Sequence, residues 1–93
     1  MTDLDGTWNV RRTGGALPPL IGVTKRISGT RGATRVLEIV GVPFTVDGLS
    51  LRYDRPFSAF VDVLTPAGEG FSGRATFYGR EYGRFELRRA DGN

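Results

Sequence analysis

The chain has 93 residues, of which 39% are hydrophobic and 25% charged, and its formal net charge is +3. This length allows one small domain with a single core, so we expect residues 1–93 to form one domain. The chain contains no cysteine and no histidine. Their absence excludes disulfides, thiolate catalysis, histidine-dependent triads and the usual zinc and haem sites, so we expect no cofactor and no metal.

The positive charge comes from twelve arginines and a single lysine, Lys25. Such a surplus favours anionic partners, but ten acidic residues are interspersed with it, which is typical of a mixed, solvated surface. No apolar run reaches the length of a membrane span, and the N-terminus is acidic and lacks the apolar stretch of a secretory signal. We therefore expect a cytoplasmic protein without a membrane span.

The first half of the chain shows the alternation of half-buried strands. Residues 7–12 place Trp8 and Val10 on one face, and residues 23–28 place Val23 and Ile27 on one face. We predict a strand in each range, with a glycine-containing turn over residues 28–32.

The segment between these strands, residues 16–22, is apolar and contains the pair Pro18-Pro19. Adjacent prolines exclude a helix interior and an inner strand. The segment is expected to cover an apolar surface through residues such as Leu20, either as a movable lid or as a permanent plug.

In the middle of the chain, residues 34–46 are predicted to form a strand that is kinked or broken near Gly41. Asp47-Gly48 then has the composition of a two-residue type I′ hairpin loop. Pairing about that loop sets Phe44 opposite Leu51 on the inner face.

A strand at residues 57–64 follows, with a loop at residues 66–70, and pairing Thr65 with Glu69 places Val61 inward. The same register places Phe60 and Leu64 outward. These two residues are then candidates for the interface of a homodimer, because exposed apolar residues on adjacent strands form a patch that favours being covered.

The last hairpin is predicted to turn at residues 80–82, with Phe77 opposite Phe85 on the inner face. On the outer face this register sets Arg74 opposite Arg88. Opposed like charges are unfavourable unless they are screened, and we interpret this pair as a screened surface pair.

The fold class predicted from these elements is all-β, with seven or eight short antiparallel strands and no substantial helix. A meander of this kind has to protect its edges, and closure into an up-and-down β-barrel does so. A small open sandwich is the alternative. The interior of so small a barrel is either filled by side chains or holds one small ligand.

Gly6-Thr7-Trp8, at the start of the first strand, resembles the Gly-x-Trp motif of the calycins, the superfamily of lipocalins and fatty-acid-binding proteins. The resemblance implies a miniature or dimeric ligand-binding barrel for a small lipophilic molecule. It also implies that an arginine of the last strand packs across Trp8 at the closed end. The matching residue is Arg88 or its neighbour Arg89, and we assign this role to Arg88.

The predicted function is therefore non-catalytic binding of a small apolar ligand inside the barrel, with Tyr53 as a polar anchor. Small residues on the inner face, Gly73 and Ala75, either leave space for a ligand or let facing side chains pack closely. The candidate ligand-binding residues are Trp8, Leu20, Phe44, Leu51, Tyr53, Val61, Ala75, Phe77 and Phe85.

Three alternatives remain open from the sequence. The barrel could be a self-associating module with a filled core. It could bind single-stranded nucleic acid, for which the outward residues would be Arg74, Arg80 and Arg84 with Tyr78 and Tyr82. Catalysis would have to use carboxylates, tyrosines or arginines, among them Tyr53 and Arg55. Nothing in the sequence assigns two of the carboxylates to one pocket, and the candidates are Glu38, Asp54, Asp62 and Glu86.

Overall fold

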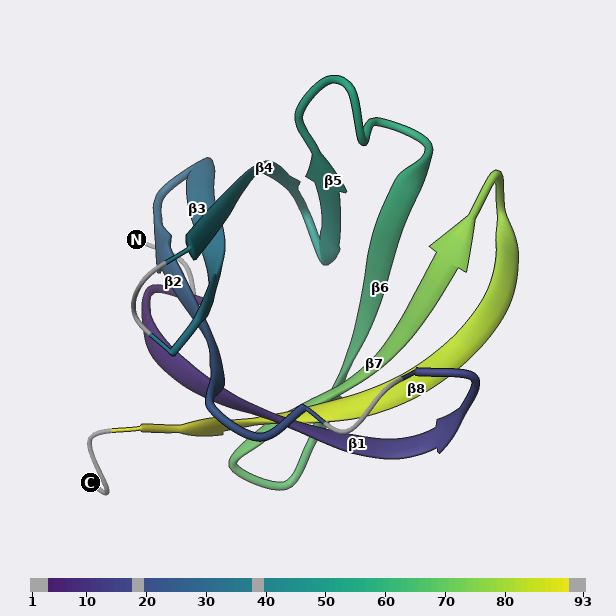
Figure 1. Ribbon diagram of the computed structural model, residues 1–93. Helices are drawn as coiled ribbons and strands as arrows, with labels where there is room; N and C mark the ends of the chain where they lie inside the picture. Colours follow the sequence, from purple (N-terminus) through teal and green to yellow (C-terminus); the bar gives the residue numbers. More distant parts are fainter. Residues whose placement is uncertain (1–3, 18–19, 38–39, 91–93) are drawn as a thin grey trace.

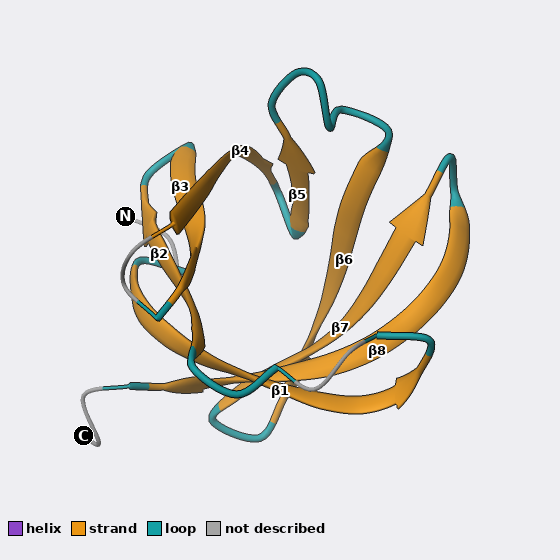
Figure 2. Cartoon of the chain, in the orientation of Figure 1, coloured by secondary structure: helices purple, strands orange, loops and turns teal. Residues whose placement is uncertain are grey.

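A computed structural model describes residues 4–17, 20–37 and 40–90 of the chain. Within these ranges the chain forms strands and loops and no helix (Figure 2). None of the described residues belongs to a helix with the length and apolarity that a membrane crossing requires. The strands are β1 (Gly6–Gly15), β2 (Val23–Ser28), β3 (Arg31–Val36), β4 (Val40–Asp47), β5 (Ser50–Tyr53), β6 (Phe60–Ala67), β7 (Gly70–Phe77) and β8 (Arg80–Arg89).

Each strand pairs antiparallel with the next, and β8 pairs with β1, so the sheet closes into an up-and-down barrel (Figure 1). Closure removes the unpaired sheet edges that an open meander would expose. The prediction of an all-β barrel of seven or eight short strands is confirmed, with eight strands.

The two ends of the barrel differ. At one end lie the tight turns after β2, β4 and β6 together with the start of β1 and the end of β8. At the other end lie the longer connections after β1 and β5 and the connections after β3 and β7. We call these the closed end and the open end.

Trp8 is the centre of the closed end. Its ring is 1% exposed and packs edge-on against Phe71, with ring centroids 5.4 Å apart. Its indole Nε1 donates a hydrogen bond to the carbonyl oxygen of Leu4 at 2.8 Å, and Leu4 is itself buried. This packing seals the barrel below the tryptophan.

Arg89, and not Arg88, covers the tryptophan. Its guanidinium carbon lies 4.4 Å from the centroid of the Trp8 ring, because Arg89 is the residue that pairs with Trp8 in the β1–β8 ladder. Arg88 pairs with Asn9 and is exposed, with Nε 3.2 Å from Glu86. The assignment of barrel closure to Arg88 is wrong by one residue, which in a strand reverses the face.

Residues 34–46, predicted as one strand kinked or broken near Gly41, belong to two antiparallel strands, β3 and β4. The chain reverses direction between Val36 and Val40, which pair with each other, and Gly41 lies inside β4.

The hairpin between β4 and β5 turns at Gly48-Leu49, one residue later than predicted, so Phe44 pairs with Tyr53. Because this changes the pairing by two residues, both Phe44 and the residue predicted to face it, Leu51, remain inside.

The register of β6 differs from the prediction by an odd number of residues, and its faces are reversed. The hairpin turns tightly at Gly68-Glu69, where Gly68 has a φ of 60°, so Leu64 pairs with Gly73. Leu64 is 2% exposed and belongs to the core. The predictions of an outward Phe60 and Leu64 and an inward Val61 are therefore wrong.

The last hairpin turns at Tyr78-Gly79, with φ values of 50° and 82°, and not at residues 80–82. Two successive positive φ angles are typical of a type I′ turn. A register shift next to Ala75 and Thr76 accommodates the change. Arg74 consequently faces Arg84 and not Arg88.

Phe77, predicted to lie inside opposite Phe85, lies at the rim of the open end. It pairs with Arg80, is 44% exposed, and packs against Phe60 and Tyr78 with ring centroids 4.7 and 4.6 Å away. β7 includes Phe77, but the register shift between Ala75 and Thr76 interrupts the alternation there, so Ala75 and Thr76 are both buried and Phe77 is exposed.

Candidate functional site

The interior of the barrel contains a charged side chain, Lys25 of β2, which is only 3% exposed. Its ammonium Nζ donates hydrogen bonds to Thr34 Oγ1 and to the Tyr53 hydroxyl, each at 2.7 Å. It also forms an ion pair with Asp62, with Nζ 3.0 Å from Oδ2. A buried ammonium is tolerated when its donors are satisfied and its charge is paired, and both conditions are met here.

The Tyr53 hydroxyl connects the other members of this group. It lies 2.8 Å from Thr34 Oγ1 and donates to Asp62 Oδ2 at 3.0 Å. The four residues come from β2, β3, β5 and β6, so the barrel brings together side chains that are far apart in the sequence. We call Lys25, Thr34, Tyr53 and Asp62 the polar cluster.

Aromatic rings surround the ammonium group. Lys25 Nζ lies 5.4 Å from the ring centroid of Phe44, 5.2 Å from that of Tyr53 and 5.5 Å from that of Phe85. The faces of aromatic rings attract cations. The rings thus add to the attraction of Asp62 in holding the charge inside the barrel.

The protonation states follow from this environment. Burial alone would lower the pKa of Lys25, but Tyr53 and Asp62, whose oxygens contact Nζ, more than offset it and raise that pKa. Burial raises the pKa of the Tyr53 hydroxyl, which the neighbouring Lys25 partly opposes. At neutral pH the cluster therefore contains an ammonium and a neutral phenol.

A cavity of about 330 Å³ adjoins the polar cluster and extends toward the open end. Its lining includes all four residues of the cluster. The other lining residues are mostly apolar: Val10, Leu17, Leu20, Val23, Val42, Phe57, Phe60, Ala75, Tyr82 and Phe85. An apolar hollow with a few convergent polar groups is the usual form of a small-molecule site.

The structure places the predicted ligand-binding residues in three different surroundings. Those that line the cavity are Leu20, Tyr53, Ala75 and Phe85. Those buried in the core outside the cavity lining are Trp8, Phe44 and Leu51. Val61 lies on the outer face of β6, and Phe77 lies on the rim.

Gly73 shows how the core below the cavity is filled. A Cβ atom at this position would come within 2.3 Å of the Phe85 ring, so the glycine allows that ring to lie directly against the backbone of β7. Small inner residues were expected either to leave space for a ligand or to let facing side chains pack closely, and Gly73 does the second. Ala75, in contrast, lines the cavity.

Lys25 and Asp62 were not among the predicted ligand-binding residues. Lys25 has the same strand parity as Val23 and Ile27, which were assigned to the inner face, so alternation alone could have placed it inside. Asp62 has the parity of Phe60 and Leu64. Because the predicted register put that face outside, Asp62 appeared to be an ordinary solvated carboxylate.

The other carboxylates considered for catalysis lie outside the barrel. Asp54 forms an ion pair with Arg31 at 2.6 Å, and Glu86 lies 3.2 Å from Arg11. Glu38 lies outside the described residues, as does the Pro18-Pro19 pair. Among the described residues, no group of three acidic side chains is placed to hold a metal ion.

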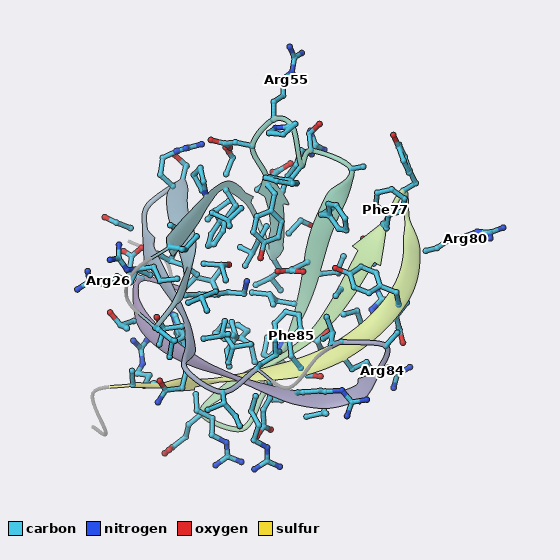
Figure 3. The ribbon with its side chains drawn as sticks, in the orientation of Figure 1. Arg26, Arg55, Phe77, Arg80, Arg84 and Phe85 are labelled. Carbon is cyan, nitrogen blue, oxygen red and sulfur yellow. The ribbon has the colours of Figure 1, made fainter. Side chains whose placement is uncertain are left out.

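The outward arginines are distributed around the barrel. Figure 3 shows Phe85 pointing into the interior, while Arg26, Arg55, Arg80 and Arg84 point away from it. Of the tyrosines considered for stacking on nucleic acid, Tyr78 is 79% exposed, whereas Tyr82 lines the cavity. The predicted stacking surface is therefore reduced to Tyr78 with its neighbour Phe77.

A second hollow, of about 670 Å³, lies beside β1 and β2, which pair only as far as Asn9 and Thr24. Leu17 and Leu20 line both hollows and stand between them. Leu17 is held in place, since its carbonyl oxygen accepts a hydrogen bond from Arg12 Nε at 2.7 Å. The second hollow contains none of the polar cluster, so we take the interior cavity as the candidate site.

Comparison with protein-family models, with curated proteins and with solved structures finds no match for the chain. A functional proposal for this protein therefore rests on the cavity and the polar cluster.

Proposed function

We propose that the barrel binds a small, largely apolar molecule in its interior cavity and does not transform it. The observation that carries this proposal is the cavity of about 330 Å³ with apolar walls and the buried polar cluster beside it. Small-molecule cavities commonly span about 300–1,000 Å³, so the ligand would be at the small end of that range.

The polar cluster supports a binding role more than a purely structural one. Replacing a buried ion pair with apolar residues of similar volume is often neutral or stabilising. A pair of this kind, Lys25 with Asp62, is therefore a poor way to fill a core. Placed beside a hollow, it provides polar atoms that orient a ligand.

The same groups are poorly suited to catalysis. The raised pKa of Lys25 keeps it as an ammonium, which is not a nucleophile. The raised pKa of Tyr53 keeps it as a phenol, which is not a general base at neutral pH. The proposal is accordingly one of binding.

Binding of the neutral fluorescent dye N-phenyl-1-naphthylamine tests the proposal. The wild-type protein should enhance its emission, and Ala75→Phe, which fills the cavity wall, should abolish the enhancement. Ala67→Phe introduces the same side chain at the exposed closed end and should bind like the wild type. Equal enhancement by both variants would show that the dye binds elsewhere.

A second candidate function is self-association, which the apolar rim of the open end favours. Phe57, Phe77 and Tyr78 are 48%, 44% and 79% exposed at this rim. We propose that a second copy covers them, in place of the contact through Phe60 and Leu64. Analytical ultracentrifugation should then show a dimer that Phe77→Asp dissociates, and a monomeric wild type would refute this candidate.

A further inference from the structure

Hydrogen-bond capacity within the polar cluster is almost fully used. An ammonium group has three donors and no acceptor. The three donors of Lys25 are matched by three acceptors, Thr34 Oγ1, the Tyr53 hydroxyl and Asp62 Oδ2. Lys25 therefore has no hydrogen left to offer to a ligand.

The hydroxyl hydrogens are used as well. Tyr53 donates its hydrogen to Asp62 Oδ2. The Thr34 hydroxyl, 2.8 Å from the Tyr53 oxygen, then donates to that oxygen. Neither hydroxyl retains a free hydrogen, so the cluster presents no unused donor to the cavity.

One oxygen atom of the polar cluster accepts no hydrogen bond from the described residues. Both contacts of the Asp62 carboxylate with the described part of the chain are made by Oδ2, and Oδ1 accepts no hydrogen bond from it. Asp62 is 5% exposed and lines the cavity. Its Oδ1 is not completely enclosed by protein atoms, so a ligand in the cavity can reach it. A buried carboxylate oxygen that lacks a donor is unfavourable until one arrives.

We infer that the cavity selects ligands that carry an uncharged hydrogen-bond donor, such as an alcohol, a phenol or an amide N–H. The donor group would bind to Asp62 Oδ1. This inference rests on the proposed function and defines the class of ligand for the same cavity.

Other classes of ligand are disfavoured by the same geometry. An ionised carboxylic acid would bring a second negative charge beside Asp62 and find no free hydrogen on Lys25. An ether or ketone would place an acceptor against an acceptor. A cationic amine would approach Asp62 but also the ammonium of Lys25. Tyr82, which lines the cavity too, can both donate and accept and so does not discriminate.

Three matched ligands test the inference on the wild-type protein. They are 4-butylphenol, its methyl ether 4-butylanisole, and 4-butylbenzoate, titrated by isothermal calorimetry at neutral pH. Hydrogen bonds to charged groups contribute enough that the phenol should bind at least about tenfold more tightly than the anisole. The benzoate should bind more weakly than the phenol by at least the same factor.

Failure of the inference can be separated from failure of the proposed function. If the dye binds but the phenol is not preferred over the anisole, or the benzoate binds most tightly, the selectivity for donors is wrong and ligand binding stands. If neither the dye nor any of the three compounds binds, the proposed function itself is wrong.

Asp62→Asn should weaken the selectivity. Its amide oxygen would remain with Lys25 while the amide NH₂ faces the cavity, so the preference for the phenol over the benzoate should fall by about tenfold or more. Asp54→Asn removes a carboxylate from the outer surface and should leave selectivity unchanged. Unchanged selectivity in a folded Asp62→Asn variant would overturn the inference. If that variant does not fold, the three ligands on the wild type decide.

Discussion

Lys25 and Asp62 meet across the interior of the barrel, with Nζ and Oδ2 3.0 Å apart. They come from β2 and β6, which lie opposite each other in the closed order of eight strands. Closed-end residues such as Trp8 and Phe71 are packed together, whereas the cavity lies toward the open end. The ion pair thus marks the boundary between the filled part of the interior and the hollow part.

Replacing one member of this pair should strongly destabilise the fold. Lys25→Met leaves the buried Asp62 carboxylate without its counter-charge, and we expect the free energy of unfolding to fall by about 3–5 kcal/mol. Urea denaturation followed by circular dichroism measures this. A loss below about 0.5 kcal/mol would mean that water, and not Lys25, compensates the carboxylate.

The double variant Lys25→Met with Asp62→Leu is the matched control. It removes both charges together, so its free energy of unfolding should return to within about 1 kcal/mol of the wild type or exceed it. A double variant as unstable as Lys25→Met would show that the loss comes from packing and not from the unpaired charge.

The stability of the protein should depend on pH in the alkaline range. Folding raises the pKa of Lys25 above its ordinary 10.5 and that of Tyr53 above its ordinary 10.0. The folded state therefore holds these protons more tightly, and the stability they contribute is present below about pH 10 and lost as the pH rises through the folded pKa values. Thermal denaturation should show a midpoint that falls above about pH 10.

A triple variant tests whether the cluster causes this fall. Lys25→Met, Tyr53→Phe and Asp62→Leu together remove both raised groups and the carboxylate. The triple variant should keep its melting temperature further into the alkaline range. Identical alkaline profiles for the two proteins would place the cause elsewhere.

Two adjacent arginines should differ sharply in their effect on stability. Arg89 lies over the Trp8 ring and its Nη1 donates to the carbonyl oxygen of Asp5 at 3.0 Å, so Arg89→Met should cost about 1–2 kcal/mol and shift the tryptophan emission. Arg88→Met removes an exposed contact with Glu86 and should change stability by less than about 0.5 kcal/mol. Equal losses would contradict the assignment of barrel closure to Arg89.

Two glycines in strands should also behave differently. Gly73→Ala places a methyl group against the Phe85 ring, and such overpacking should cost about 1–3 kcal/mol. Gly41→Ala has no atom within 4 Å of the new Cβ, and should be neutral or slightly stabilising. Chemical denaturation of both variants compares them, and a neutral Gly73→Ala would mean that the ring can move away.

Two leucines test the corrected register of β6. Leu64 is 2% exposed and Leu49 is 40% exposed. Leu64→Ala should therefore cost about 2–5 kcal/mol in free energy of unfolding, and Leu49→Ala less than about 1 kcal/mol. A loss below about 1 kcal/mol for Leu64→Ala would contradict the inward position of Leu64 and favour the outward position predicted from the sequence.

Much of the fold could be predicted from local patterns. The strand at residues 23–28 has the predicted bounds, and the inward positions of Trp8, Val10 and Ile27 follow from alternation with a period of two. The registers of the later hairpins could not be predicted, because several adjacent glycine-containing pairs are compatible with a turn. At Gly68-Glu69 a shift by an odd number of residues was enough to exchange the two faces of β6.

The site was less accessible from the sequence than the fold. Tyr53 was identified as a polar anchor because it shares the inner face with Phe44. Lys25 and Asp62 were missed because an isolated charged residue in a strand normally faces water. Each of the two side chains is stabilised inside the barrel by the other. They meet only because the sheet closes, so the sequence around either residue does not show the pairing.

Native mass spectrometry of the purified protein tests the central claim, that the interior cavity holds a small molecule. We predict that the wild-type spectrum contains a reproducible additional mass that is lost on denaturation, and that Ala75→Phe lacks this mass while Ala67→Phe retains it. The same spectra report the number of subunits. A bare wild-type protein, or an additional mass that persists unchanged in Ala75→Phe, would contradict binding in the cavity.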